Sequence, residues 1–193
     1  MSRYTCPVNP DVERFAHEQS VEFTKQNLSV AYLVTDIIDN ELLAYFALAI
    51  KPISVNTAQF SNTMRRKIEK IAQVNEQTGE YLVAAFLIAQ LGKNFTDGMN
   101  DRITGVQLLE LAVDKVRALQ YMAGGTVVFL ETQNVPQLLS FYEANASLRI
   151  VYSSTLYVNS VSCAIAQRRF KQFAVRQSYT PDQHKLVQLL RVL

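Results

Sequence analysis

The spacing of apolar residues changes along the chain, and near the N-terminus it predicts a helix followed by two strands. Apolar residues recur at helical spacing over 11–25, directly after Pro10, which is suited to a helix start. Residues 29–35 alternate, 41–50 are apolar on both sides, and turn-forming residues at 36–40 separate them. The two strands are therefore expected to form an antiparallel hairpin, with the second at a central position of a sheet.

A polar segment at 56–78 interrupts this pattern. It has a thin apolar stripe and carries Arg65, Arg66 and Lys67, which predicts a surface helix inserted between strands. An almost wholly apolar run follows at 81–91. This run predicts a third strand, buried on both faces.

The best-marked helix begins at Thr104, after a polar loop at 92–102. Thr104 and Gln107 have the spacing of a capping box, in which the hydroxyl accepts from the third helical amide and the glutamine reaches back. Gly124 and Gly125 are expected to end the helix. One face of it carries Leu108, Leu109, Ala112, Val116 and Leu119.

Beyond that helix, the pattern predicts a buried strand at 126–132 and a short helix at 135–146, with Pro136 in its first turn. Another strand is expected at 148–156, and 158–175 has room for one more. Thr180 and Gln183 form a second capping-box pattern. It predicts a terminal helix that runs through Leu193.

The order of these elements predicts a mixed α/β fold. A strand–helix–strand unit at 81–132 implies a right-handed crossover between parallel strands, and the hairpin ahead of it adds antiparallel pairs. With 193 residues and no Pro/Gly/Ser-rich linker, the chain is expected to form a single domain, 1–193, with the helical excursion at 56–78.

Charge is unevenly distributed along the chain. Residues 1–147 carry 12 Lys/Arg against 16 Asp/Glu, whereas the C-terminal basic segment, 148–193, carries 7 against 1. Such a segment suits an anionic ligand, a nucleic acid or an acidic partner surface, or is simply a solvated face. Within it, residues 168–171 combine three cations with Phe170, as RNA-contacting surfaces do, although such a tetrad is common.

Cysteines, histidines and apolar runs exclude several classes of protein. Cys6 and Cys163 have no metal-binding or redox spacing, which favours reduced thiols in a cytoplasmic protein, with a disulfide as the alternative. His17 and His184 lie far apart in sequence, and no metal-ligand cluster is present, so no metal is expected. No apolar run approaches the roughly 20 residues of a membrane-spanning helix, and no secretory signal is visible at the N-terminus.

The helix that starts at Thr104 is the part of the chain best suited to bind an anion. Its first N–H groups lack intrahelical partners and lie at the positive end of the helix dipole. No lysine follows Gly105, and no Gly-x-Gly-x-x-Gly occurs, so neither a P-loop nor a dinucleotide fingerprint is present. Any helix start has free amides, so this signal alone is weak.

Four stretches resemble, in their order and spacing, the GNAT superfamily of acyl-CoA-dependent N-acetyltransferases. They are AQLGKN at 89–94, ITGVQLL at 103–109, VVFLE at 127–131 and LSFYE at 139–143, and the resemblance covers roughly 10–156. It implies a mixed, mostly antiparallel sheet with a central splayed parallel pair and helices on both faces. It also implies acetyl-CoA as the acyl donor.

The resemblance implies a cofactor site between the strands at 81–91 and 126–132. The loop motif of the family aligns with 100–105, where Gly105 matches. Asn100 stands in place of an Arg/Gln, and Ile103 in place of a glycine. The backbone of the first strand would pair with the acyl arm, and the loop amides would hold the pyrophosphate. The implied cofactor residues are Leu91, Gly92, Lys93, Arg102, Ile103, Thr104, Gly105, Val106 and Asn134.

The loop's departure from the family pattern bears on affinity. Ile103 adds a side chain where the backbone must approach phosphate closely. Arg102 is expected to supply a compensating charge. Reduced cofactor affinity and a non-catalytic descendant of the family are both compatible with this loop.

Tyr142 is the expected catalytic residue, because in the family a tyrosine in this Phe/Leu-Tyr-Glu context protonates the departing thiolate. The alternative is that Phe141 and Tyr142 only pack the helix against the sheet. Glu41 and Glu80 are candidate bases or ordinary surface carboxylates. Strand amides near Leu91 would stabilise the oxyanion.

The predicted function is therefore transfer of an acetyl group from acetyl-CoA to a primary amine by direct attack. One alternative is a binding or interaction protein that keeps the fold without the activity. Another is toxin-like acetylation of aminoacyl-tRNA, which the basic segment 148–193 would suit. A homodimer is possible, since the pairing of 157–180 could come from a second chain.

Overall fold

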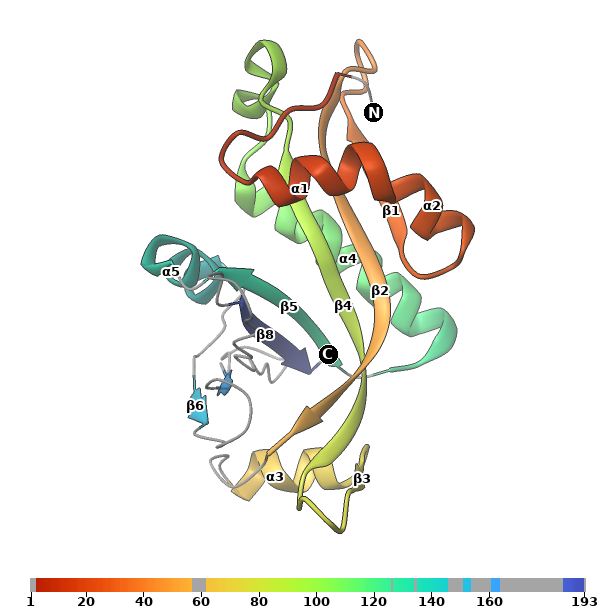
Figure 1. The fold of residues 1–193 in the computed structure, drawn as a ribbon, viewed down its shortest axis with the longest axis vertical. Helices are drawn as coiled ribbons and strands as arrows, with labels where there is room; N and C mark the ends of the chain where they lie inside the picture. The colour runs from red at the N-terminus through yellow and green to blue at the C-terminus, as the bar shows by residue number, and fades with distance from the viewer. Residues whose placement is uncertain are drawn as a thin grey trace. The chain divides into compact units, whose positions relative to one another are not determined.

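The computed structural model describes most of the chain up to Asn145 and three short strands beyond it. The described ranges are 3–56, 62–125, 127–133, 135–145, 151–153, 161–163 and 186–192. The chain divides into two compact units, each built from two segments (Figure 1). The first unit comprises Met1–Ile50 and Ile88–Leu119, and the second comprises Lys51–Leu87 and Gln120–Leu193. The expectation of a single domain stays a prediction.

The predicted opening helix is confirmed, with one irregularity. It consists of α1 (Pro10–Arg14), a π-helical turn η1 (Phe15–Gln19) and α2 (Ser20–Lys25). Asn9 caps it through its side chain, which accepts from the Val12 amide at 3.4 Å. The π turn, in which the Ser20 N–H donates to the Phe15 carbonyl, has no signature in the apolar spacing.

The predicted hairpin is also confirmed. Strands β1 (Val30–Thr35) and β2 (Leu42–Val55) pair antiparallel, with Val30 opposite Leu48. β2 extends five residues beyond the predicted end at Ile50 and passes through Pro52. Leu48 is the last residue of β2 that pairs with β1, and Pro52 lies beyond it. Proline, which has no N–H to donate, is tolerated there because no β1 residue pairs with that part of β2.

The insertion folds into a helix and a two-residue strand. α3 (Asn62–Glu69) confirms the surface helix, and β3 (Gln73–Val74), which was not predicted, pairs antiparallel with β4 (Tyr81–Lys93). The expectation that this strand is buried on both faces along its whole length is wrong near its start. Its middle is buried, but Leu82 near its start is 58% exposed. The apolar composition of β4 does not indicate where the elements that cover it end and leave it exposed.

The long helix and its glycine stop are confirmed. α4 (Gly105–Ala123) ends where Gly124 and Gly125 adopt φ angles of 76° and 100°, in the left-handed region that glycine tolerates. A side chain at Gly125 would also lie 2.6 Å from the Phe86 ring. The loop predicted at 92–102 is shorter than expected, because β4 runs to Lys93 and a 3₁₀ turn, η2 (Thr96–Asp101), fills the rest.

The C-terminal part contains one clear correction. The predicted helix through Leu193 is wrong over β8 (Leu186–Val192), which is a strand paired antiparallel with β5 (Val127–Gln133). Pairing with β5 satisfies the backbone groups of both strands, and β-branched Val187 and Val192 favour a strand. This non-local partner outweighs the local capping signal at 180–183, which itself lies outside the described residues.

The remaining predicted elements are present where they are described. α5 (Pro136–Asn145) confirms the short helix with Pro136 at its start. Strands β6 (Val151–Ser153) and β7 (Val161–Cys163) lie within the ranges predicted for strands and pair antiparallel with each other. The rest of 148–175 lies outside the described residues.

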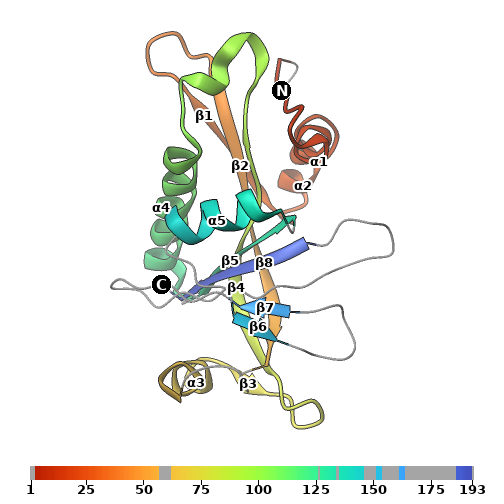
Figure 2. The same cartoon turned by 90° about the vertical axis from the view of Figure 1, so that its left-hand side faces the viewer.

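The sheet confirms the mixed α/β class. Its strand order is β1-β2-β4-β5-β8, with β3 added beside β4, and β5 is parallel to its neighbour β4. In the first unit, α1 and α2 lie on one face of the sheet and α4 lies on the other, as Figure 2 shows. The splaying of the parallel pair stays a prediction.

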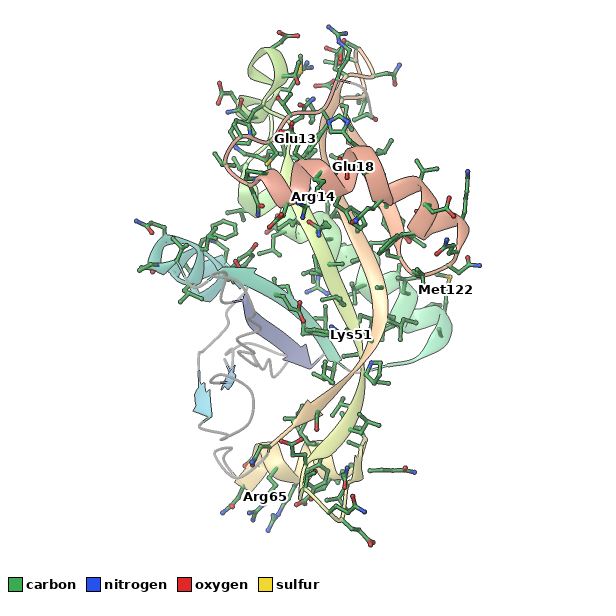
Figure 3. The ribbon with its side chains drawn as sticks, viewed as in Figure 1. Glu13, Arg14, Glu18, Lys51, Arg65 and Met122 are labelled. Carbon is green, nitrogen blue, oxygen red and sulfur yellow. The ribbon has the colours of Figure 1, made fainter. Side chains whose placement is uncertain are left out.

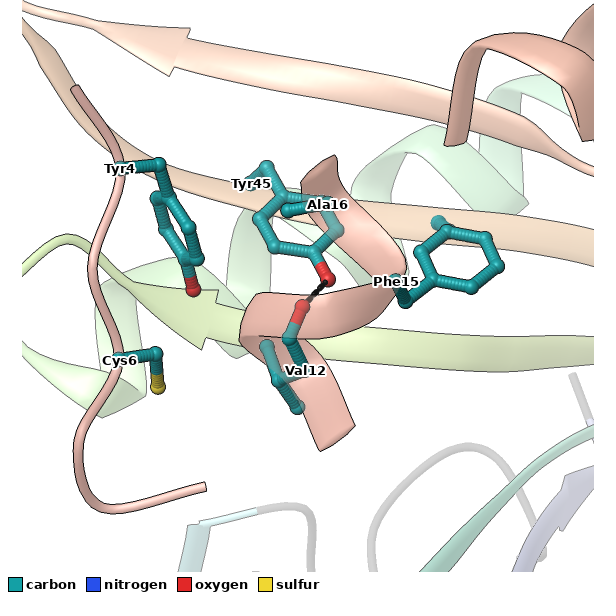
Figure 4. Packing of buried hydrophobic residues seen from close by; sticks show 7 residues of the cluster. Tyr4, Cys6, Val12, Phe15, Ala16 and Tyr45 are labelled. Carbon is teal, nitrogen blue, oxygen red and sulfur yellow. Dashed lines mark hydrogen bonds between the residues drawn. The ribbon is translucent and has the colours of Figure 1, made fainter. Parts of the chain in front are cut away.

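A buried cluster fixes the N-terminal segment and the first helix to the sheet (Figure 4). Tyr45 of β2 donates its hydroxyl to the Val12 carbonyl at 2.6 Å, and the Tyr4 ring packs edge-on against Tyr45 at 5.1 Å. Burial is the main cause that raises the pKa of Tyr4, Tyr45 and the Cys6 thiol. The cluster contains Tyr4, Cys6, Val12, Phe15, Ala16, Tyr45 and Ala47.

These buried acids predict a loss of stability at alkaline pH. A group with a higher pKa in the folded state stabilises the fold below its unfolded pKa, about 9 for Cys6 and about 10 for Tyr4 and Tyr45, and that stabilisation declines above it. The free energy of unfolding should fall by about 1 kcal/mol per pH unit for each group beyond that point. Urea denaturation of the full chain at pH 8, 9.5 and 11 checks this. A Tyr4→Phe variant should show a shallower decline, and an equal slope in both proteins would contradict it.

Candidate functional site

The start of α4 leaves two backbone donors free. The predicted capping box is present, since the Thr104 hydroxyl accepts from the Gln107 amide at 3.1 Å and Gln107 Oε1 accepts from the Thr104 amide at 2.9 Å. The Leu108 amide donates to the Thr104 carbonyl at 3.1 Å. Among the described residues, the N–H groups of Gly105 and Val106 have no acceptor. They lie at the positive end of a 19-residue helix, which is the arrangement that binds phosphate.

Arg102, expected beside the phosphate, is held by two carboxylates of the β1–β2 turn. Its guanidinium lies 2.5 Å from Asp36 and 2.9 Å from Asp39. The hydrogen bond to Asp39 is the main cause that raises the pKa of Arg102 further. The hydrogen bond from the backbone N–H of Glu41 is the main cause that lowers the pKa of the Asp39 carboxyl, and Arg102 lowers this pKa further. The three charged groups sum to one negative charge, so Arg102 presents no excess positive charge in this arrangement.

The turn that holds Arg102 is itself ordered by its own side chains. Asp36 accepts from the Ile38 amide at 2.8 Å, and Asp39 accepts from the Glu41 amide at 3.0 Å. Asn40 adopts a positive φ of 59°, which asparagine tolerates better than most residues. The two aspartates are therefore already oriented for the arginine, and the Arg102 side chain is directed to the hairpin.

Ile103 does not seal the free amides from solvent. Its side chain is only 6% exposed, whereas Gly105 and Val106 remain partly exposed. Ile103 lines a surface hollow of about 360 Å³ together with Leu43, Arg102, Gln107, Glu110, Leu111 and Asp114. The Ile103 side chain is thus accommodated within the first unit, and the role of the loop amides toward a diphosphate stays a prediction.

The end of β4 is packed tightly against the N-terminal segment. A side chain at Gly92 would lie 2.3 Å from the Tyr4 hydroxyl and 2.4 Å from the Val12 methyl Cγ1, so only glycine fits. The Lys93 ammonium donates to the Asn100 carbonyl at 2.8 Å and thereby holds the turn that precedes α4. Leu91 is partly buried. Packing alone thus accounts for Gly92, and the roles of 91–93 toward a cofactor stay predictions.

Asn94 positions the segments that meet at the end of β4, a role that the sequence did not predict. It is 3% exposed, and its side-chain oxygen accepts from the Thr5 and Thr96 amides, each at 3.1 Å. Its side-chain amide donates to the Leu42 carbonyl at 2.8 Å, and its backbone amide donates to the Leu43 carbonyl at 2.8 Å. The available signal was a polar residue directly after an apolar strand, which does not reveal partners this distant in sequence.

Tyr142 lies on α5 in the second unit and is 8% exposed. Burial raises its pKa to about 12, so the phenol keeps its proton at neutral pH. Its ring packs edge-on against that of the neighbouring Phe141 at 5.1 Å, and the alternative that the two rings pack the helix against the sheet stays a prediction. Asn134 lies outside the described residues. The other cofactor residues belong to the first unit, and a site shared with Tyr142 stays a prediction.

The two candidate bases have structural partners. Glu80 accepts from the Ser54 hydroxyl at 2.5 Å, and Glu41 lies 3.8 Å from the Arg3 guanidinium. The ring nitrogen Nε2 of His17 is hydrogen-bonded to the Tyr4 carbonyl at 2.8 Å, whereas His184 lies outside the described residues. The proton-transfer roles of the carboxylates stay predictions.

The described residues form neither a metal centre nor a membrane-spanning helix. No group of three or more His, Cys, Asp or Glu side chains in this part of the chain is placed to hold a metal ion. None of the helices in the described ranges is long and apolar enough to cross a membrane.

Comparison with solved structures identifies the fold. AtaT complexed with acetyl-methionyl-tRNAfMet matches with a TM-score of 0.57 and 15% identity, over 76% of this chain and 78% of that one. A tyrosine-to-phenylalanine mutant of KacT matches with a TM-score of 0.56 and 12% identity, over 83% and 85%. AtaTR bound with acetyl-CoA matches with a TM-score of 0.56 and 14% identity, over 84% of each chain.

These neighbours are GNAT-fold acetyltransferases, and the chain has their fold. At 12–15% identity, the similarity shows the fold alone. No family model matches the sequence, and no curated protein matches it.

Proposed function

We propose that this protein is an N-acetyltransferase that moves an acetyl group from acetyl-CoA to a primary amine. The observation that carries the proposal is the pair of free N–H groups of Gly105 and Val106 at the start of α4, within a GNAT fold. They suit the diphosphate of the donor. The acetyl-CoA of the AtaTR structure supports the choice of donor.

Each part of the proposed site has a separate role. The amides of Gly105 and Val106 bind the diphosphate, and the backbone of 91–93 pairs with the pantetheine arm. Bound acetyl-CoA supplies an activated thioester carbonyl. Tyr142 donates its hydroxyl proton to the thiolate sulfur as the carbon–sulfur bond breaks, and its raised pKa keeps that proton available. Structures of AtaT and KacT with a tyrosine replaced by phenylalanine support a role for a tyrosine in this fold.

The acceptor must be deprotonated before it attacks. An alkyl ammonium has a pKa of about 10, so a base or solvent takes one proton at neutral pH. Glu80 and Glu41 remain the proposed candidates, although Ser54 and Arg3 already engage them. A weakly basic acceptor such as an α-amino group, with a pKa of about 8, needs less help.

Titration calorimetry with acetyl-CoA, desulfo-CoA and ATP tests the donor site. Acetyl-CoA and desulfo-CoA should both bind the full chain, because the diphosphate and pantetheine carry recognition, and ATP should bind more weakly. A thiol-release assay with a panel of primary amines then tests transfer. The absence of heat with high-micromolar acetyl-CoA would exclude the enzyme and favour the non-catalytic binding protein.

Neutralising the two aspartates that hold Arg102 should strengthen donor binding. In an Asp36→Asn, Asp39→Asn variant the local charge changes from −1 to +1, and the guanidinium becomes available to the diphosphate. We expect the dissociation constant for acetyl-CoA to fall about tenfold in calorimetry. Adding Arg102→Gln should abolish the gain. A gain that survives this third substitution would show that Arg102 is not its source.

Aminoacyl-tRNA is a second candidate acceptor. The observation that favours it is the C-terminal basic segment 148–193, with 7 Lys/Arg against 1 acidic residue. The fold neighbour AtaT, complexed with acetyl-methionyl-tRNAfMet, supports it. The test is to neutralise the basic residues of 148–193 and to measure acetylation of charged tRNA. Unchanged acetylation would argue against this segment as the RNA contact.

A further inference from the structure

Strand β1 forms one edge of the sheet, and among the described strands only β2 pairs with it. The Ala31 amide donates to the Thr24 hydroxyl of α2 at 3.4 Å, so this N–H points away from β2. The N–H of Leu33 points the same way, because backbone groups alternate in direction along a strand. The outer side of β1 therefore carries backbone groups that are placed to pair with another strand.

β1 lacks the features by which edge strands usually avoid such pairing. Its sequence, VAYLVT, contains no charged residue and no proline, and its register with β2 is regular over residues 30–34. A register shift, which also protects edges, occurs only between Val34 and Thr35. None of the six residues is buried, although five are apolar, and Leu33 is 55% exposed. The strand is therefore an uncovered apolar edge.

Exposed apolar side chains continue beyond both ends of β1. Leu28 precedes the strand and is 54% exposed, and Ile37 follows it and is 93% exposed. Two copies of one strand that pair about a two-fold axis run antiparallel, so the start of each copy lies beside the end of the other. Leu28 of one copy then lies near Ile37 of the second copy, and both lose contact with water.

The charges at the two ends of β1 are complementary in the same arrangement. Lys25, the last residue of α2, is exposed close to the start of the strand. The turn after the strand holds Asp36 and Asp39, which with Arg102 sum to one negative charge. Antiparallel pairing brings Lys25 of each copy toward the acidic turn of the other. Parallel pairing would instead bring the two acidic turns together, so the charges favour the antiparallel, two-fold arrangement.

We infer that β1 pairs antiparallel with β1 of a second copy of this chain. Main-chain hydrogen bonds between the two edges supply the affinity, and the apolar and charged residues at the strand ends fix the orientation. A contact that uses the same surface on both copies closes on itself, so it produces a dimer rather than a filament. The inference concerns assembly and does not depend on acetyl transfer.

Sedimentation velocity of the full chain at 1–100 µM tests this inference and should show a reversible dimer. Leu33→Lys and Leu33→Glu should each raise the dissociation constant of the dimer about tenfold or more, because like charges then meet across the two-fold axis. An equal mixture of the two variants should restore dimers, since opposite charges now face each other. Met122→Lys is the matched control, because Met122, labelled in Figure 3, is an exposed apolar residue of the second unit. It should change the dissociation constant less than about threefold.

A second variant keeps the test valid if substitutions within β1 unfold the chain, which urea denaturation would reveal. Lys25→Glu lies outside the strand and places a negative charge beside the acidic turn of the other copy, so it should weaken the dimer about fivefold.

Three results would overturn the inference. A monomer at 100 µM would exclude self-pairing and leave the edge to a strand of a different protein. A dimer that Leu33→Lys and Lys25→Glu weaken no more than Met122→Lys would have its interface elsewhere. Failure of the folded Leu33→Lys and Leu33→Glu variants to associate when mixed would show that the two copies of β1 do not meet. None of these results bears on acetyl-CoA binding, so the proposed function would stand.

Discussion

Replacing Gly92 with alanine is expected to lower the free energy of unfolding by about 3 kcal/mol, at the upper end of the range for overpacking. The added Cβ would lie 2.3 Å from the Tyr4 hydroxyl and 2.4 Å from Val12 Cγ1, far inside van der Waals contact. Both neighbours belong to the buried cluster and have little room to move. The φ angle of Gly92 is not in the left-handed region, so the loss reflects packing rather than backbone strain.

Urea denaturation of the full chain measures the effect. In a Tyr4→Phe, Val12→Ala background, which removes the two clashing groups, the same Gly92→Ala substitution should cost less than about 1 kcal/mol. Gly79→Ala is the matched control, because a side chain there meets nothing within 4 Å and only the φ of 69° opposes it. It should cost about 1 kcal/mol. An equal loss at both glycines, or no rescue in the double-substituted background, would refute the packing explanation.

Local patterns in the sequence predicted most elements of the fold. The helix at 105–123 was recognisable because its capping box, apolar face and terminal glycines all act within a few residues. The hairpin was recognisable for the same reason. β8 was mistaken for a helix because its pairing partner β5 lies about 60 residues earlier, and no local signal encodes that distance.

The candidate site was less predictable because its main contacts join distant segments. Arg102 reads as a cation next to a phosphate-binding loop, yet the structure directs it to Asp36 and Asp39 in the first hairpin. Gly92 reads as part of a cofactor strand, yet the space beside it is filled by Tyr4. In each case the residue type suggested chemistry, whereas the observed partner is a structural one. The free amides of α4 were predictable, since they follow from the helix start itself.

Tyr142→Phe is expected to reduce turnover about 100-fold while leaving the dissociation constant of acetyl-CoA unchanged. The substitution removes the proton donor and keeps the ring that packs against Phe141 at 5.1 Å. General acid catalysis contributes about 10²- to 10⁴-fold, and water replaces part of it. A loss confined to kcat, with an unchanged KM, would separate proton donation from a packing role.

The pH dependence of turnover provides a second, independent readout of the same residue. Because burial raises the pKa of Tyr142 to about 12, the wild-type phenol stays protonated well above pH 10, and kcat should not decline on the alkaline side below about pH 11. An unperturbed tyrosine would lose half of its acid form at about pH 10. Tyr121→Phe is the matched control, since Tyr121 is 93% exposed and should tolerate the change without effect. Unchanged turnover in Tyr142→Phe would remove Tyr142 from the reaction, and a wild-type alkaline limb centred near pH 10 that disappears in Tyr142→Phe would contradict the raised pKa.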